Sequence, residues 1–166
     1  MLLVALLVRI TSKGPALFWS SRVGQYNTVF MMPKFRTMLL DTPAVATHLM
    51  PNPEMFLSPI GRLLRRTSLD ELPQLFSILK GEMSFVGPRP ALFNQDDLVA
   101  QRTEKGLESL VPGLTGWAQV NGRDELSIQE KTAFDVEYMG KRSFWFDLKI
   151  LWLTLIKVVR NDGVLH

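Results

Sequence analysis

The alternation of apolar and polar positions predicts a mainly helical chain with one β-hairpin. Apolar residues run without a break from Met1 to Val8, which is typical of a buried strand or of the end of a core helix. Two strand-like stretches, Ala16–Val23 and Thr28–Met38, follow on either side of the turn-forming residues 24–27. Pro33 lacks a backbone N–H, so we expect the second strand to lie at a sheet edge or to carry a bulge.

Helical spacing and helix boundary signals cover most of the remaining sequence. Ser68 and Glu71 match a capping box, so a central helix is expected to begin between Ser68 and Asp70 and to end before Gly81. The other expected elements are a helix over Pro59–Arg65, a polar helix from Asn94 or Asp96 to Leu110, a strand over Thr115–Val120 and a helix from Ser127 to about Gly140, while Leu39–Pro53 is expected to be irregular.

The last predicted helix, Phe144–Arg160, has the clearest amphipathic pattern. Tryptophans on an apolar face and lysines on a polar face suit the interface of a bilayer, but the same pattern fits a helix that packs on a core. The apolar face carries Trp145, Leu148, Trp152, Leu155 and Val159, and the other face carries Asp147, Lys149, Thr154, Lys157 and Arg160.

Length and composition narrow the possible functions. A chain of 166 residues indicates a single domain. It has no cysteine, which excludes disulfides and thiol chemistry, and His48 and His166 alone do not match a zinc site. A formal charge of +3 fits nucleic acid, an anionic membrane surface or phosphate-bearing substrates. Because no tract interleaves basic and aromatic residues, we expect no nucleic-acid partner.

Two adjacent carboxylates, Asp70 and Glu71, follow two adjacent arginines, Arg65 and Arg66, at the expected helix start. The local pattern alone favours a capped helix with a charged first turn. Arg89, however, lies between two prolines, and a cation held that rigidly suits a phosphate. Carboxylates, arginines and a divalent ion such as Mg²⁺ are together what phosphoryl transfer requires.

The other basic residues are ambiguous from the pattern alone. Lys34 and Arg36 alternate on a predicted strand, so they face one side, either as an exposed surface or as a grip on a phosphate. Arg123 follows a turn, where a surface position is usual. Asp147, on the polar side of the last helix, has Lys149 or solvent as its ordinary partner.

Several ordered motifs carry a resemblance to a known family. Residues 66–90 resemble the signature of the bacterial sugar transferases, which are monotopic polyprenyl-phosphate phosphoglycosyl transferases. Three flanking stretches are similar to the same family, over Lys34–Met38, Pro112–Arg123 and Phe146–Leu151. The resemblance extends from about Thr11 to the C-terminus, and several long motifs in order make it specific.

The resemblance implies a fold, a reaction and a set of site residues. The fold is α+β, a mainly helical single domain with a small hairpin sheet and amphipathic interfacial helices. Asp70 falls at the position of the family's nucleophile and Glu71 at that of its metal-binding carboxylate, so both are expected near Mg²⁺. The residues expected to bind substrate or phosphate are Lys34, Arg36, Arg65, Arg89, Arg123 and Asp147, with Asp135 as a weaker candidate.

The implied reaction uses a nucleotide-sugar donor, typically a UDP-sugar, and a polyprenyl phosphate acceptor, typically undecaprenyl phosphate. Asp70 takes the phosphosugar, nucleoside monophosphate leaves, and the acceptor then removes the phosphosugar. The product begins the assembly of a surface glycan such as exopolysaccharide, capsule or O-antigen. The resemblance leaves the sugar, the glycan pathway and the oligomeric state open.

The resemblance also implies attachment to the cytoplasmic face of the bacterial inner membrane. Residues 1–10 are expected to be the last part of a longer N-terminal membrane segment, and residues 11–166 the catalytic domain. Trp145, Trp152, Leu155 and Met1–Val8 are expected to lie on one side of the molecule as an apolar patch that meets lipid. The alternative is a non-catalytic, truncated module that binds membrane within a glycan-assembly complex.

Overall fold

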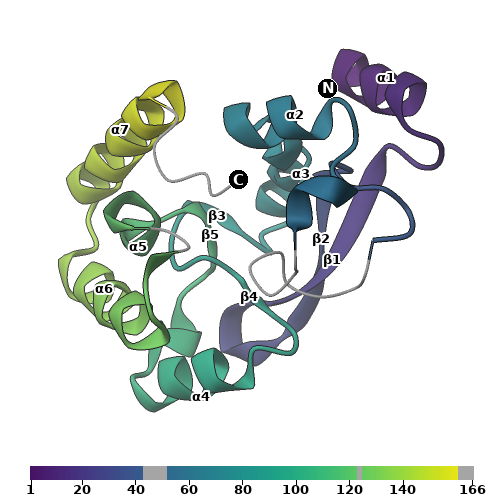
Figure 1. Ribbon diagram of the computed structural model, residues 1–166. Coiled ribbons are helices and arrows are strands. Elements are labelled where there is room, and N and C mark those ends of the chain that lie inside the picture. The colour runs from purple at the N-terminus through teal and green to yellow at the C-terminus, as the bar shows by residue number, and fades with distance from the viewer. Residues whose placement is uncertain (43–51, 123–124, 161–166) are drawn as a thin grey trace.

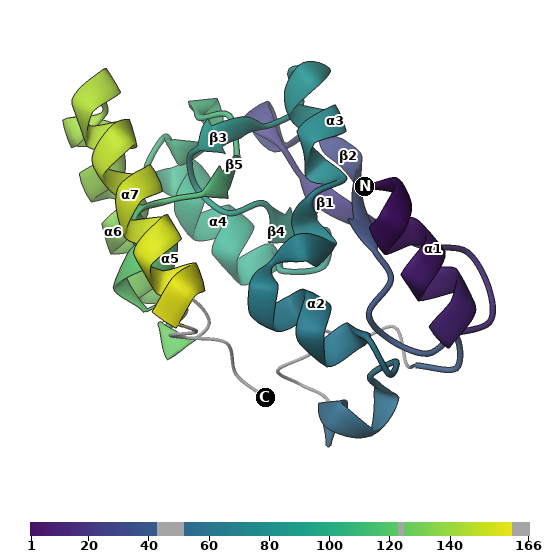
Figure 2. The ribbon, with the colours of Figure 1, turned by 90° about the horizontal axis from the view of Figure 1, so that it is seen from above.

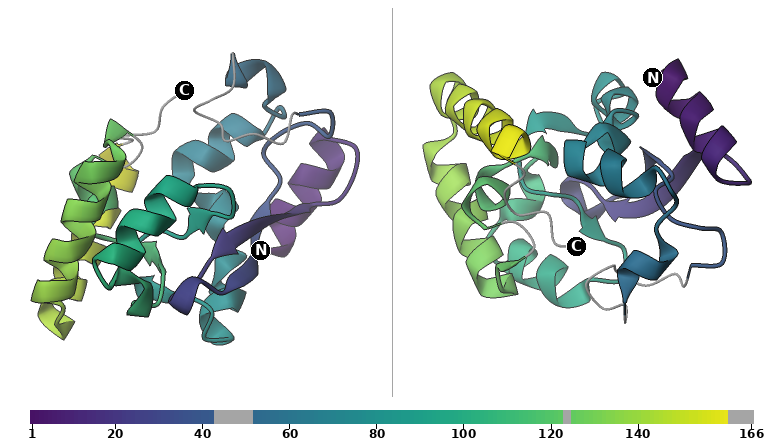
Figure 3. Two further views of the ribbon diagram at one scale, coloured as in Figure 1. Left: turned by 90° about the horizontal axis from the view of Figure 1, so that it is seen from below. Right: turned by 45° about the horizontal axis from the view of Figure 1, so that its top comes forward.

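The computed structural model describes residues 1–42, 52–122 and 125–160, and it confirms the predicted mainly helical α+β fold. Helices surround two small sheets, with α6 and α7 side by side at one end of the molecule and α1 at the other (Figures 1, 2 and 3). The α-helices are α1 Leu2–Thr11, α2 Gly61–Thr67, α3 Gln74–Leu79, α4 Asp96–Glu104, α5 Trp117–Asn121, α6 Ile128–Lys141 and α7 Phe144–Arg160. The strands are β1 Leu17–Val23, β2 Val29–Phe35, β3 Ser84–Val86, β4 Ala91–Leu92 and β5 Gly113–Thr115, and the 3₁₀ turns are η1 Gln25–Asn27, η3 Pro53–Phe56, η4 Leu69–Glu71 and η5 Leu107–Ser109.

The predicted hairpin forms the larger sheet. Strands β1 and β2 are antiparallel, with Phe18 opposite Lys34 and Trp19 opposite Pro33. The strand order is β2-β1-β4, so β2 is an edge strand and the missing N–H of Pro33 breaks no ladder in the sheet interior. The hairpin therefore carries Lys34 on a rigid strand.

The central helix begins later than the capping pattern predicted. Ser68 adopts a left-handed conformation with φ 55°, and its N–H caps the end of α2 by donating to the carbonyls of Arg65 and Leu64. Its side chain caps nothing, the chain continues as the short turn η4, and α3 starts only after Pro73. The prediction failed because the residue that resembles a helix start ends the preceding helix. Asp70 and Glu71 consequently lie on a tight turn between two helices.

Two further predictions of secondary structure are wrong for related reasons. The expected strand Thr115–Val120 ends at Thr115, and α5 follows it, because Trp117 and Val120 both pack on the core at helical spacing. The expected long polar helix stops at Glu104, since Gly106 adopts a left-handed conformation with φ 73° and η5 follows. The Ser127 capping box and the helix up to about Gly140 are confirmed in α6.

Two apolar clusters hold the fold together. One joins α5, α6 and α7 to the small parallel sheet of β3 and β5, through Val86, Leu107, Leu110, Val120, Tyr138 and Ile150. The other joins α1 to β2 and α2, through Val8, Phe35 and Leu64. The Met1–Val8 stretch is therefore the first part of a helix, of which one side contacts the core.

Helices α1 and α7 also expose many apolar side chains. Trp145 is 76% exposed and Trp152 63%, whereas Ile150 of the same helix is fully buried. Seen from above, α7 and α1 lie at opposite ends of one face, with α2 and α3 between them (Figure 2). The middle helices also expose apolar side chains, at Leu63, Phe76 and Leu79. No helix in the described part of the chain combines the length and apolarity needed to cross a bilayer.

A close crossing of strands β3 and β5 requires glycine. A Cβ on Gly113 would lie 2.1 Å from the backbone N of Gly87, and the next nearest atom is the backbone O of Thr115. Neither backbone atom can move aside. We expect Gly113→Ala to lower the free energy of unfolding by about 1–3 kcal/mol, as overpacking does, measured by urea denaturation. Gly140→Ala is the control, because nothing lies within 4 Å of its Cβ position on α6. This control should stabilise the protein by about 1 kcal/mol, and an equal loss in both variants would contradict the argument.

Candidate active site

Glu71 is the centre of a buried charge cluster that three separate segments build. Its Oε1 accepts a hydrogen bond from Lys34 Nζ at 2.9 Å and another from Arg89 Nη2 at 2.9 Å. Lys34 comes from β2, Glu71 from η4, and Arg89 from the Pro-Arg-Pro run after β3. The side chains of Glu71 and Lys34 are only 12% and 16% exposed, so water screens this cluster weakly.

The cluster fixes the charge of Glu71. Burial alone would raise the pKa of Glu71, but the charges of Lys34 and Arg89, and the hydrogen bonds that both donate, hold this pKa well below its usual range. Burial lowers the pKa of Lys34, and the charge of Glu71 opposes that shift. Glu71 is therefore an ionised carboxylate at neutral pH.

Asp70 lies beside this cluster but experiences a different environment. It is only 8% exposed, and burial raises its pKa. The negative charge of Glu71 raises this pKa further, whereas Lys34, Arg65 and Arg89 lower it. The two adjacent carboxylates are thus distinct, since the pKa of one is lowered by cations and the pKa of the other is raised by burial.

Arg65 reaches the same region from the last turn of α2. Its Nε donates to Thr37 Oγ1 at 3.0 Å, and its charge acts on Asp70. Thr37 follows β2, so this contact joins α2 to the strand that carries Lys34. Lys34, Arg65 and Arg89 consequently surround the carboxylate pair with positive charge.

A groove with a cavity volume of about 200 Å³ opens beside the cluster. One wall consists of η4 and the flanking ends of α2 and α3, and the other consists of β5, α5 and the C-terminal half of α7. Apolar atoms form most of its surface, while Arg66, Glu71 and Arg89 supply charge from one side and Lys157 from the other. The full lining is Arg66, Ser68, Glu71, Leu72, Leu75, Arg89, Leu114, Thr115, Gln119, Val120, Leu151, Thr154, Lys157 and Val158.

Arg36 does not join the site, contrary to the alternation argument. Strand β2 ends at Phe35, and the guanidinium of Arg36 is buried, with its Nη2 donating to the carbonyl and the hydroxyl of Ser12. Ser12 follows α1, so Arg36 attaches the N-terminal helix to the hairpin. We therefore assign Arg36 a structural position.

The two other acidic candidates are also held away from the groove. Asp147, in the first turn of α7, accepts a hydrogen bond from Tyr138 Oη at 3.0 Å. Asp135 on α6 is 1% exposed and forms an ion pair with Arg102 at 2.7 Å. Neither lines the groove, to which α7 contributes only from Leu151 onward. Arg123 lies outside the described residues, so its expected position at the site stays a prediction.

The groove contains polar residues that sequence reasoning did not select. Thr115 and Thr154 are hydrogen bonded to each other at 2.7 Å, between β5 and α7, and Gln119 of α5 also lines the groove. Thr154 and Lys157 do lie on the predicted polar face of the last helix, and this pattern was the one sequence feature that could have indicated their place in the groove. Gln119 was not predicted as a site residue because its segment was expected to be a strand, whereas it forms α5.

The donor set can be compared with the needs of Mg²⁺. Within the described residues, no cluster of three His, Cys, Asp or Glu side chains could hold a metal ion. Mg²⁺, however, commonly takes one or two carboxylates and completes its shell with phosphate oxygens and water. The ionised Glu71 and its neighbour Asp70 fit this second kind of site, in which the substrate supplies most ligands.

Comparison with known proteins agrees with the resemblance predicted from the sequence. The model of the bacterial sugar transferase family matches residues 1–161, so the chain belongs to this family. It is 43% identical over 157 residues to the uncharacterized sugar transferase EpsL of Bacillus subtilis, an alignment that covers 95% of this chain and 76% of that protein.

Two relatives have names that specify a reaction. The chain is 41% identical to the undecaprenyl-phosphate glucose phosphotransferase of Komagataeibacter xylinus, over 92% of this chain and 31% of that protein. It is 40% identical to the UDP-glucose:undecaprenyl-phosphate glucose-1-phosphate transferase of Escherichia coli, over 96% of this chain and 36% of that protein. The chain thus spans about a third of these two relatives.

The contrasting environments of the carboxylates predict opposite effects on stability. Asp70→Asn removes a charge that burial disfavours, so we expect it to raise the free energy of unfolding at pH 7 by about 0.5–2 kcal/mol. Because the native pKa of Asp70 is raised, this gain should vanish as the pH falls through that pKa and the wild-type carboxyl becomes neutral. Urea denaturation at several pH values measures it.

Glu71→Gln should do the reverse, since it leaves Lys34 and Arg89 without their counter-charge. We expect a loss of about 1–3 kcal/mol at pH 7. Because the native pKa of Glu71 is lowered, this loss should shrink only as the pH falls below the usual range of a glutamate. Destabilisation by both substitutions at pH 7 would contradict the assigned environments.

Proposed function

We propose that this protein transfers a sugar phosphate from a nucleotide diphospho-sugar to a polyprenyl phosphate, through a covalent intermediate on Asp70. The observation that carries the proposal is the buried cluster of Glu71 with Lys34 and Arg89, immediately beside Asp70 and at the wall of an apolar groove. The names of the relatives, which include glucose and galactose phosphotransferases of undecaprenyl phosphate, support the same class of reaction.

The cations prepare the site for a diphosphate. Lys34, Arg65 and Arg89 come from three segments whose positions the fold fixes before a ligand arrives. A preorganised positive field stabilises the negative charge that moves onto the leaving phosphate during transfer. The same cations favour the ionised form of Asp70, since each of them opposes the effect of burial on the pKa of Asp70.

In the first step, a carboxylate oxygen of Asp70 attacks the phosphorus that carries the sugar. The bond from this phosphorus to the bridging oxygen breaks, and its electron pair leaves with nucleoside monophosphate. In the second step, an oxygen of the acceptor phosphate attacks the same phosphorus, and the Asp70 carboxylate departs. Neither step requires a proton when Asp70 and the acceptor phosphate are ionised.

The tight turn explains how neighbouring carboxylates take different roles. Successive residues of a 3₁₀ turn point about 120° apart, so the side chains of Asp70 and Glu71 diverge. Glu71 is already bound by two cations and so is a poor nucleophile, whereas Asp70 is held at a raised pKa. Mg²⁺, when bound by Glu71, Asp70 and the diphosphate, supplies further neutralisation of phosphate charge.

The groove and the exposed helices suit a lipid acceptor. Apolar residues such as Leu72, Leu75 and Leu151 line the groove next to Glu71, so an isoprenoid chain can lie there with its phosphate near the cations. Helices α1 and α7 expose apolar side chains, and both helices lie at the face that also contains α2 and α3 (Figure 2). We propose that this face rests in the bilayer interface, at the cytoplasmic side of the bacterial inner membrane.

The decisive experiment separates the two carboxylates. The wild-type chain is mixed with a panel of UDP-sugars and Mg²⁺ without lipid acceptor, and mass spectrometry locates any phosphosugar adduct. We expect the adduct on Asp70, and Asp70→Asn should abolish the adduct and all turnover at every Mg²⁺ concentration. Glu71→Gln should lose activity but regain part of it in excess Mg²⁺, because it retains the nucleophile.

The exposed Asp97 on α4 provides the matched control for this experiment. Asp97→Asn should behave as wild type. An adduct on Glu71, or full turnover by Asp70→Asn, would overturn the assigned roles. Lipid binding without any turnover by the wild-type chain would instead favour a non-catalytic membrane module.

The proposed membrane face is tested by binding to vesicles of phosphatidylethanolamine and phosphatidylglycerol. Trp145→Ala and Trp152→Ala should each weaken binding about tenfold or more, because burying one large apolar side chain contributes about 1.5–3 kcal/mol. Trp19→Ala is the control, since Trp19 is 49% exposed but lies on β1. Equal losses in all three variants would show that the attraction is general rather than confined to this face.

A further inference from the structure

The Pro88-Arg89-Pro90 run, which carries Arg89 to the site, is held through its backbone carbonyls. The N–H of Gly113, the first residue of β5, donates to the carbonyl of Pro88 at 2.9 Å. Arg102 Nη1, on α4, donates to the carbonyl of Arg89 at 2.8 Å. Arg22 Nη1, on β1, donates to the carbonyl of Pro90 at 3.2 Å. Three consecutive carbonyls are thus bound by three elements far apart in the sequence.

Arg102 is itself held by a buried acid. Its Nε and Nη2 both donate to Asp135 Oδ2, at 3.0 and 2.7 Å, and Asp135 is only 1% exposed. Arg102 therefore uses three donors of one planar group to connect α6 with the Arg89 carbonyl. A lysine has a single nitrogen on a flexible stem and cannot reproduce this fork.

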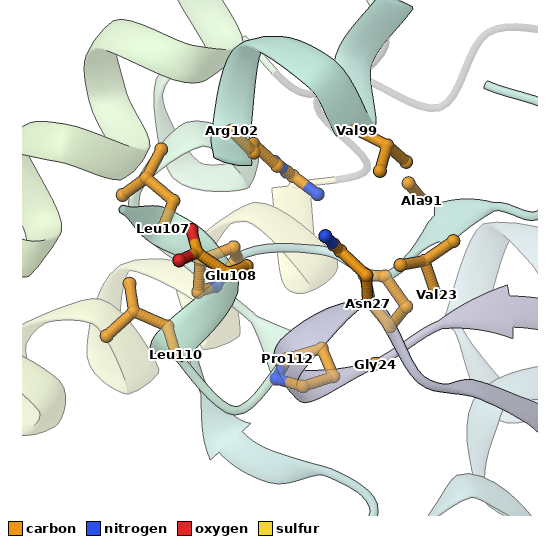
Figure 4. Close-up of a pocket in the computed structure, with 12 residues that line it drawn as sticks. Val23, Gly24, Asn27, Ala91, Val99, Arg102, Leu107, Glu108, Leu110 and Pro112 are labelled. Atoms are coloured by element: carbon orange, nitrogen blue, oxygen red, sulfur yellow. The ribbon is translucent and has the colours of Figure 1, made fainter. Parts of the chain in front are cut away.

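The space behind the run is too small for a second ligand. Its cavity volume is about 30 Å³, with Pro88, Pro90 and Arg102 in the lining, and a single water molecule needs a volume of this order. Arg102 reaches from α4 toward this space, which Asn27 and Val23 of the hairpin region face from the other side (Figure 4). The polar groups of Arg102 therefore act on Asp135 and on the Arg89 carbonyl and not on substrate.

We propose that Arg102, held by Asp135, is a positioning residue that fixes Arg89 for its contact with Glu71 and with the diphosphate. The inference rests on the proposed function for its effect on rate, but the placement of Arg89 can be measured separately. The prolines on both sides limit the backbone of the run, and the bonded carbonyls fix where that rigid run lies. With its backbone position fixed, Arg89 can place its guanidinium against Glu71 Oε1.

Arg102→Lys tests the proposal because it preserves the positive charge next to Asp135 while removing the fork. We expect kcat/KM for release of nucleoside monophosphate to fall about 10- to 100-fold, the effect of displacing a positioned group by about 1 Å. Combined with Arg89→Gln, the substitution should add less than twofold, because Arg102 then has nothing to position. Lys141→Gln, which breaks an exposed ion pair on α6, is the control and should leave the rate unchanged.

A chemical readout does not depend on turnover. Phenylglyoxal modifies accessible arginines, and mass spectrometry assigns the modified residues. We expect Arg89 to react several-fold faster in Arg102→Lys than in wild type, while the exposed Arg62 reacts at an unchanged rate. Should Arg102→Lys fail to fold, Asp135→Asn removes the same anchor with little change in shape and is expected to give the same pattern.

Each outcome decides one question. Two results would mean that Arg102 and Asp135 only stabilise the fold, and would overturn the proposal. One is a loss of kcat/KM in the double variant equal to the product of the losses in the two single variants, and the other is unchanged reactivity of Arg89. A wild-type chain that releases no nucleoside monophosphate from any UDP-sugar would contradict the proposed function. In that case faster modification of Arg89 alone would still support the positioning role.

Discussion

The ionised carboxylate of Glu71 is the constraint on which the site depends. A buried carboxylate is tolerated only when it is paired and hydrogen bonded, and here Lys34 and Arg89 meet both needs. The pairing acts in both directions, since burial lowers the pKa of Lys34 and the charge of Glu71 opposes that shift. The edge strand, the tight turn η4 and the Pro-Arg-Pro run must therefore converge on one oxygen atom, and the groove forms beside that point.

The local signals predicted the fold well where one segment decides its own structure. The hairpin, the Ser127 capping box and the amphipathic α7 were all predicted, because turn residues, caps and periodicity act within a few residues. The errors occur where distant packing decides. Ser68 has the sequence of a cap but ends α2 in a left-handed conformation, and the Thr115–Val120 segment becomes helical because Trp117 and Val120 pack together on the core.

The residues of the candidate site were likewise predicted in part, and the errors again occur where distant segments decide. Charge and motif order selected Lys34, Glu71 and Arg89, which the fold does bring into contact. Alternation along a strand failed for Arg36, because the strand ends one residue earlier and its partner is Ser12, on another segment. Asp147 likewise has a partner, Tyr138, that no local pattern identifies. The opposite wall of the groove was missed because it depends on how α7 packs across β5.

The three bonded carbonyls of the Pro-Arg-Pro run bear on how the molecule folds. Arg22 and Pro90 are 68 residues apart, and the third donor, Gly113, enters only with β5. Contacts at such separation require loop closure before they stabilise the fold, so we expect them to form late in folding. Phosphate-binding geometry should thus arise in one cooperative event, and a partly folded chain would present its arginines without the arrangement that makes them selective.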